Sequence, residues 1–305
     1  MHKLLLITVL LLSAGTAVAA LSTPRVVATI RTGASGPCAG VEAFGRIWVT
    51  DIYAGAVSTI DPKTNTLSGT NISIGGRPCG IVAGGGALWI NGYGTNSVDR
   101  LDPVKRRLAR RIRVGTSPYD VAYGFGAVWT TNNGDGTVSK INPRTNRVVK
   151  VIRTGGSPTG LAISGGAVWV GSNTGSSIFR IDPRTSRSKA IGVGHQSPAW
   201  FAATTTELWV ASNAEGLALH LDPQSGAVIA SVKVGTTPQD GTIAPDGGVW
   251  IPNMGDGTVS RIDPATATVT DTVPVGPKPF VLNVGANDVW SPSYGGADVR
   301  RIQLG

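Results

Sequence analysis

Hydrophobic and polar positions alternate along this chain in short runs that recur at a constant interval. The stretch 159–194 shows the pattern, with apolar runs at 159–164, 167–170 and 177–181 and a fourth that ends near Gly194. Glycine pairs or an Asp-Pro turn separate these runs. Short runs that are bounded by glycine, proline and aspartate are typical of β-strands joined by turns. The pattern predicts four short strands per repeat.

Three series of residues indicate that this unit occurs seven times. One series consists of tryptophans spaced by 40 or 41 residues: Trp48, Trp89, Trp129, Trp169, Trp209, Trp250 and Trp290. A second consists of prolines: Pro37, Pro78, Pro118, Pro158, Pro198, Pro238 and Pro279. A third lies thirteen residues after each of the first six tryptophans and precedes a proline, with Gln303 at the seventh position: Asp61, Asp102, Asn142, Asp182, Asp222 and Asp263. Tryptophan-marked repeats of four strands predict an all-β fold, a seven-bladed β-propeller with four-stranded blades.

The two ends of the repeat array predict how the ring closes. The seventh repeat ends after three strands, at Arg300-Arg301-Ile302. The run 25–33 (RVVATIRTG) resembles 147–155 (RVVKVIRTG), which is the fourth strand of a central repeat. We therefore expect the N-terminal strand to complete the last blade, because this removes the open sheet edges of a linear array. Residues 20–305 are predicted to form this single propeller.

The first residues predict export. A basic start at residues 1–3 precedes the apolar run 4–12, and Ala17-Val18-Ala19 offers small residues at cleavage spacing. We interpret 1–19 as a signal peptide cleaved before Ala20. The apolar run is too short for a comfortable membrane span, and no second one of spanning length follows. We expect an exported monomer without a transmembrane segment, either periplasmic or fully secreted.

The formal net charge of +9 adds a candidate interaction surface. The cations are densest in the segment 105–113, at Lys105, Arg106, Arg107, Arg110, Arg111 and Arg113. One interpretation is a solvated outer strand whose charges prevent pairing with other sheet edges. The other is a surface that binds an anionic polymer.

The repeat motif also resembles a known family. The pattern VGxxPxG(I/L)A…GxVWVxNxGDGTVSxIDPxTNxVVxxIxVG, best developed in 115–155 and 235–276, resembles the YVTN-type (YncE-like) β-propeller repeat proteins. The virginiamycin B lyase family is a related group of propellers. That relation implies a magnesium-dependent site with histidine and glutamate near the channel mouth. After residue 19 the chain offers these types at Glu42, Glu207, Glu215, His195 and His220.

Positions that depart from the repeat are the candidate ligand-binding residues, since the scaffold does not require them. We expect the residues just after each proline to lie around one end of the central channel. The candidates there are Tyr119, Asp120, His195, Trp200, Gln239, Asp240 and Phe280. Tyr119, Trp200 and Phe280 would give the channel mouth an aromatic lining able to stack on a ring or a sugar. The alternative is that these side chains only plug the channel.

Carboxylates at the channel raise two further possibilities. Asp120 and Asp240 occupy matching positions in the third and sixth repeats, and paired carboxylates serve acid–base chemistry only when they are close together. Oxygen ligands on one rim would alternatively hold Mg²⁺ or Ca²⁺ at the channel mouth. The segments 132–137 and 253–258 resemble calcium loops without the bidentate glutamate, and glycine hairpin turns explain them better.

The two cysteines form a candidate disulfide. Cys38 and Cys79 each follow a series proline, in the first and second repeats. Equivalent positions in adjacent blades near the axis are within plausible bonding distance, and an even cysteine pair in an exported protein favours a bridge. Free thiols and a soft-metal site remain the alternatives.

These observations lead to two hypotheses about function. The first is a non-catalytic exported propeller that binds a small molecule or an envelope component at its channel mouth. The second is a metal-dependent lyase or lactone hydrolase resembling virginiamycin B lyase. Motifs for a serine-hydrolase elbow, a zincin, a phosphate loop or a dinucleotide fold do not occur in the sequence.

Overall fold

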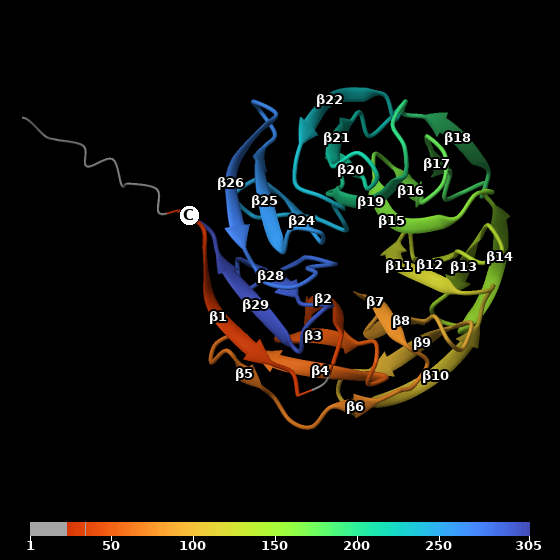
Figure 1. Ribbon diagram of the computed structural model, residues 1–305. Coiled ribbons are helices and arrows are strands. Elements are labelled where there is room, and N and C mark those ends of the chain that lie inside the picture. Colours follow the sequence, from red (N-terminus) through yellow and green to blue (C-terminus); the bar gives the residue numbers. More distant parts are fainter. Residues whose placement is uncertain (1–22, 34) are drawn as a thin grey trace, which may run out of the picture.

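Each of the first six repeats folds as an antiparallel sheet, because its short hairpin turns, most of them containing glycine, and its Asp-Pro or Asn-Pro turn reverse the chain three times. A computed structural model describes residues 23–33 and 35–305, in which seven sheets surround a central axis (Figure 1). The prediction of a seven-bladed propeller with four-stranded blades is confirmed. The predicted signal peptide, residues 1–19, lies outside the described residues.

In the first four blades, the strands follow one another in sequence order from the channel to the outer edge of the blade. Blade one contains β2 (Pro37–Ala43), β3 (Arg46–Asp51), β4 (Ala56–Asp61) and a divided outer strand, β5 (Thr66–Leu67) and β6 (Ile72–Ser73). Blade two contains β7 (Pro78–Gly84), β8 (Ala87–Gly92), β9 (Ser97–Asp102) and β10 (Arg107–Arg113). Blade three contains β11 (Pro118–Gly124), β12 (Ala127–Asn132), β13 (Thr137–Asn142) and β14 (Arg147–Arg153). Blade four contains β15 (Pro158–Ser164), β16 (Ala167–Ser172), β17 (Ser177–Ile181) and β18 (Ser188–Gly192).

The remaining three blades follow the same plan. Blade five contains β19 (Pro198–Ala203), β20 (Leu208–Ser212), β21 (Leu217–Leu221) and β22 (Val228–Lys233). Blade six contains β23 (Thr242–Ile243), β24 (Val249–Asn253), β25 (Thr258–Asp263) and β26 (Thr268–Pro274). Blade seven contains β27 (Asn283–Gly285), β28 (Asp288–Pro292), β29 (Asp298–Gln303) and, as its outer strand, β1 (Arg25–Arg31).

The pairing of β1 with β29 closes the ring, as the sequence predicts. The two strands are antiparallel, and Ile30 opposite Val299 places two buried side chains at the seam. Figure 1 shows the first and last strands side by side. Since β1 and β29 come from opposite ends of the chain, this one pairing joins the first element to the last.

The repeat tryptophans are part of the scaffold, as predicted. All seven are at most 1% exposed, and Trp169 packs with Phe201 and Leu219 of the next blade. A basic side chain from the adjacent strand lies over most of the indoles; the Lys140 Nζ, for example, is 4.9 Å from the ring centre of Trp129. Such contacts shield the indole and attract the cation to its face. The tryptophans therefore stabilise the contacts between blades and do not form a binding site.

Blade one departs from this rule. Thr59 occupies the position opposite Trp48, where five of the other blades carry arginine or lysine and blade five carries His220. The guanidinium of Arg106, from the outer turn of blade two, lies 5.7 Å from the centre of the Trp48 ring and donates to Thr59 Oγ1 at 3.1 Å. One member of the predicted basic segment is therefore used inside the scaffold. Within the described residues, no helix has the length and apolar character needed to cross a lipid bilayer.

Candidate functional site

One face of the ring carries the residues that follow the series prolines. Each inner strand of the first five blades begins at its proline, and Pro118 lies opposite Asn132 at the end of the second strand. The loops after the tryptophan strands therefore emerge beside the prolines, as expected; the Asn133 amide donates to the Ser117 carbonyl at 3.1 Å. We call this face of the ring the proline face.

An unbroken series of aromatic contacts crosses the centre of the proline face. Ring centres are 5.9 Å apart between Tyr93 and Tyr119, 5.5 Å between Tyr119 and Trp200, and 5.2 Å between Trp200 and Phe280. Tyr294 continues the series, 5.4 Å from Phe280. Trp200 and Phe280 are buried, whereas the three tyrosines are partly exposed. The three predicted aromatic residues are thus in contact, with the two buried rings beneath the tyrosines.

A cavity of about 330 Å³ lies within this series, and we call it the aromatic cup. Its lining consists of Cys38, Ile52, Arg77, Cys79, Asn91, Tyr93, Tyr119, Met254, Phe280 and Tyr294. Most of this lining is apolar or aromatic, and the polar groups are few. A cavity of this size with an apolar wall and a few polar groups is typical of small-molecule sites.

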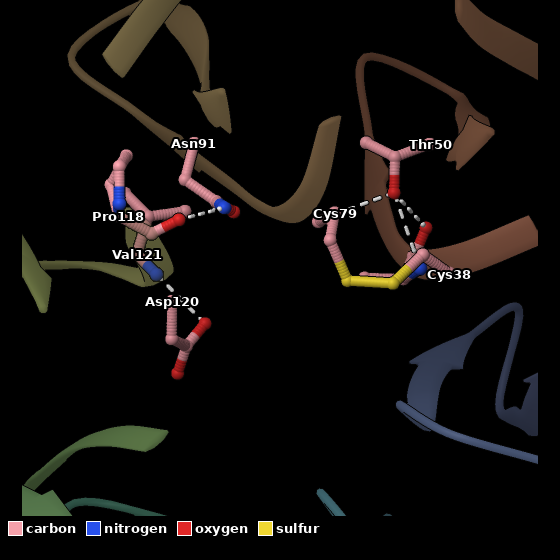
Figure 2. The surroundings of a disulfide bond; sticks show 8 residues. Cys38, Thr50, Cys79, Asn91, Pro118, Asp120 and Val121 are labelled. Carbon is pink, nitrogen blue, oxygen red and sulfur yellow. Dashed lines mark hydrogen bonds between the residues drawn. A yellow bond between two sulfur atoms is a disulfide. The ribbon is translucent and has the colours of Figure 1, made fainter. Parts of the chain in front are cut away.

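Two polar side chains give the cup its hydrogen-bonding character. The Asn91 amide donates to the Pro118 carbonyl at 2.8 Å, and its carbonyl oxygen is buried without a hydrogen-bond partner (Figure 2). The guanidinium of Arg77 lies 5.5 Å from the ring centre of Tyr93. Among the cup's lining residues, Arg77 therefore offers hydrogen-bond donors to a ligand, whereas the Asn91 carbonyl oxygen lies close to Gly80 and Asp120 of the inner strands.

A second cavity of about 360 Å³ adjoins the cup on the same face, and Tyr119, Met254 and Phe280 contribute to both. Gln239 and the loop asparagines Asn173 and Asn213 also line it. Gln239 is buried, and its side-chain amide donates to the Thr237 carbonyl at 3.3 Å. The predicted residue Gln239 therefore belongs to a polar region beside the cup.

The predicted disulfide between Cys38 and Cys79 is present. The two residues belong to the inner strands of blades one and two, with their Cα atoms 5.2 Å apart. The Thr50 hydroxyl donates to the Cys79 carbonyl at 2.5 Å and accepts from the Ala39 amide at 3.2 Å (Figure 2). The bridge lines the cup and ties two adjacent blades together there.

The predicted carboxylates Asp120 and Asp240 lie in a different space. They line a channel cavity of about 310 Å³, which we call the acidic chamber. Asp120 accepts from the Val121 and Leu161 amides, both at 2.7 Å, and Asp240 accepts from the Phe201 amide at 3.1 Å. Apart from these two carboxylates, its lining residues are uncharged. The chamber and the cup share no lining residue.

Burial without a counter-charge disfavours ionisation in the chamber. Desolvation raises the pKa of Asp120 to about 7, although its two amide hydrogen bonds oppose the shift. Desolvation, followed by the charge of Asp120, raises the pKa of Asp240 well above its ordinary value. The two carboxylates therefore interact despite originating in blades three and six, a proximity that the sequence left in doubt.

The predicted residue His195 lies away from both spaces. Its Nδ1 is 2.7 Å from Glu215 Oε2, and Glu215 also accepts from the Gln196 amide at 2.6 Å. The other described histidine, His220, stacks on Trp209 with ring centres 4.4 Å apart and contacts Glu207 at 3.0 Å. Both histidines thus pair with a glutamate, and neither lines the cup or the acidic chamber.

The cup does not provide the donors that a divalent cation prefers. No carboxylate lines it, and across residues 23–33 and 35–305 no three His, Cys, Asp or Glu side chains gather around one point. In the calcium-like loop, Asp135 accepts from the Thr116 amide at 2.8 Å and the Thr137 hydroxyl at 2.6 Å. Asp256 accepts from both the amide and the hydroxyl of Thr236. These loops are hairpin turns whose carboxylates fix the neighbouring chain.

Comparison with known proteins shows the fold. No family model matches the chain, and no curated protein matches its sequence. A streptogramin B lyase structure is similar, with a TM-score of 0.79 and 16% identity over 89% of this chain and 94% of that chain. Virginiamycin B lyase from Staphylococcus aureus gives a TM-score of 0.80 and 15% identity over 91% and 98% of the two chains. The WD40 propeller domain of Doa1 gives a TM-score of 0.80 and 13% identity over 92% and 97%.

At such low identities, the likeness establishes a shared propeller fold and leaves the activity open. A lyase and a WD40 domain resemble the chain equally well, so the fold does not choose between catalysis and binding. The likeness shows the β-propeller fold that the chain shares with these structures, and it does not distinguish the YVTN type.

Sequence reasoning missed the residues that complete the cup. Tyr93, Met254 and Tyr294 each lie four residues after a repeat tryptophan. Ile52 holds this position in the first repeat and also lines the cup, whereas the third, fourth and fifth repeats carry asparagine there, and Asn213 donates its side-chain amide to the Pro238 carbonyl at 3.1 Å. The residues at this position of the repeats lie around the channel mouth. Repeats that lack asparagine there could therefore have predicted additional lining residues.

Proposed function

We propose that the chain is an exported, non-catalytic propeller that binds a small ring-containing molecule in the aromatic cup. The observation that carries this proposal is a cavity of about 330 Å³ lined by the rings of Tyr93, Tyr119, Phe280 and Tyr294. Aromatic rings stack on planar compounds or on the apolar face of a sugar.

The chemistry of the cup narrows the ligand class. About 330 Å³ accommodates one or two rings, and Arg77 is the only charged residue of its lining. A neutral or weakly anionic ligand therefore fits better than a cation. The disulfide supports an oxidising compartment and hence export, since such bridges persist mainly outside the reducing cytosol.

Ligand screening of the folded protein tests the proposal. Binding of a panel of phenols, aromatic acids and monosaccharides is measured by saturation-transfer NMR for the wild type and for Tyr93→Ala. Phe125→Ala is the matched control, because Phe125 is an exposed ring on the hairpin at the opposite face. A ligand that loses about tenfold in affinity in Tyr93→Ala alone supports the cup. Equal binding to all three proteins excludes it.

The second candidate function is a metal-dependent lyase or lactone hydrolase resembling virginiamycin B lyase. The observation that favours it is the interacting pair Asp120 and Asp240 in a channel cavity. The pairing of His195 and His220 with glutamates outside the cup and the chamber counts against a shared histidine site. Turnover of a streptogramin or lactone that is stimulated by Mg²⁺ and lost in Asp240→Asn would favour this function over simple binding.

A further inference from the structure

The outer strands of blades two and three carry matching sets of cations. Arg107, Arg110 and Arg113 in β10 correspond, forty residues later, to Arg147, Lys150 and Arg153 in β14. All six side chains are exposed, and in the part of the chain that the structure describes none of them forms an ion pair. We call these six residues the basic wall.

A groove of about 440 Å³ lies between blades two and three at the basic wall. Arg113 lines it from β10 and Arg153 from β14, with Val148 and Val151 between them. The one carboxylate of the groove, Asp135, already accepts from the Thr116 amide and the Thr137 hydroxyl. Two guanidinium groups from neighbouring blades therefore flank an elongated space without a free acidic partner.

Another pair of blades shows that the scaffold does not need these cations. Blades five and six form an equivalent groove of about 340 Å³, lined by Lys233 on one side and by Val269 and Thr272 on the other. The strand β26, which corresponds to β14, contains Asp271 and no lysine or arginine. Because the same groove forms without the basic wall, packing does not explain six clustered like charges.

We propose that the basic wall binds a flexible, phosphate-bearing polymer along the groove between β10 and β14. Guanidinium groups match phosphate oxygens in geometry and charge, and a polyanion relieves the repulsion among the six cations. The two strands lie on neighbouring blades of a ring, so the wall is convex (Figure 1). A flat membrane would contact one blade at a time, whereas a flexible chain follows the curve. The wall is separate from the aromatic cup, so this proposal is independent of the proposed ligand.

Binding of labelled polymers tests the proposal. Fluorescence anisotropy is measured with inorganic polyphosphate and with a single-stranded oligodeoxynucleotide of equal length, at about 50 to 200 mM salt, a range that spans physiological ionic strength. The test variant is Arg113→Gln with Arg153→Gln. The matched control is Arg31→Gln with Lys233→Gln, which removes two exposed charges from other outer strands. We expect the test variant to lose about tenfold in affinity. The slope of the logarithm of the binding constant against the logarithm of the salt concentration should become shallower by about 1.4 for the oligodeoxynucleotide.

The outcomes separate the alternatives. Equal losses in the test variant and the control show attraction to net charge alone, and they overturn the proposal. No binding by the wild type overturns it as well, as does tighter binding to phosphatidylglycerol vesicles than to either polymer. Binding to both polymers supports recognition of the phosphate group itself. Binding to only one of them supports the proposal and identifies which polymer backbone the basic wall recognises. Equal melting temperatures of the two variants confirm that both are folded.

Discussion

Asp120 and Asp240 originate in blades three and six, yet they bind the inner strands of two blades that are neighbours. Asp120 accepts from the amide of Leu161 in blade four, and Asp240 accepts from that of Phe201 in blade five. Each side chain therefore bridges to an adjacent blade between them, which brings the two carboxylates toward each other. Their mutual repulsion contributes to the raised pKa of Asp240.

Asp240→Asn should stabilise the protein at alkaline pH. The raised pKa means that the folded state holds a proton on Asp240 more tightly than the unfolded state does, so wild-type stability falls as pH rises above about 4. Asparagine keeps an acceptor for the Phe201 amide and removes the like charge. We expect the variant to have a higher melting temperature than the wild type at pH 8 and an equal one at pH 4.

Thermal unfolding at the two pH values checks this expectation, with pH 4 as the internal control. A lower melting temperature for the variant at pH 8 would contradict the account. It would indicate that the charged pair is stabilised by a bound cation, as the lyase alternative requires.

Asp51→Asn should have a similar effect for a separate reason. Asp51 is fully buried, and desolvation raises its pKa to about 6 although it accepts from the Ser58 hydroxyl at 2.5 Å. In blade three the equivalent residue is Asn132, whose amide donates to Ser139 at 3.0 Å. Wild-type stability should fall between about pH 4 and 6, so the variant gains up to about 3 kcal/mol above that window.

The reciprocal change is the control for this second prediction. Asn132→Asp places a buried carboxyl in blade three and should destabilise the protein at pH 8 much more than at pH 4. Urea unfolding of both variants across this range provides the measurement. If the free energy of unfolding changed with pH in the same way for both variants and the wild type, burial at this position would not govern titration of the carboxyl group.

Removal of the disulfide should weaken the fold. Cys38 and Cys79 are separated by 41 residues, and the chain-entropy estimate for a loop of this length is about 4 kcal/mol. The variant with Cys38→Ala and Cys79→Ala should therefore unfold at a clearly lower urea concentration than the oxidised wild type. Reduced wild type should resemble the variant. Identical midpoints for all three proteins would mean that blade packing alone holds this region.

The fold could be predicted from the sequence because its causes are local and repeated. Every blade contains a tryptophan equivalent to Trp129 and a proline equivalent to Pro118. Glycine, aspartate or asparagine occupies most of the turns between strands. Closure by β1 was also predictable, since its sequence matches that of β14. The divided outer strand of blade one was not predicted.

The candidate site was less predictable, because the repeat pattern does not show which cavity each side chain of an inner strand lines. Tyr119 and Asp120 are adjacent in sequence, yet one lines the cup and the other the acidic chamber, since successive strand residues point to opposite sides. His195 is close to Trp200 in sequence but pairs with Glu215. The departures from the repeat identified the right region, and the structure divides them among four places: the cup, the cavity beside it, the acidic chamber and the contact of His195 with Glu215.

The most direct test of a ligand-binding cup is a crystal of the mature protein soaked with ring-containing fragments. The account expects electron density for a ring beside Tyr93 and Tyr294, in the cavity that Tyr119 and Phe280 also line. Density confined to the chamber beside Asp120 and Asp240, or an empty cup after soaking with the full panel, would contradict it.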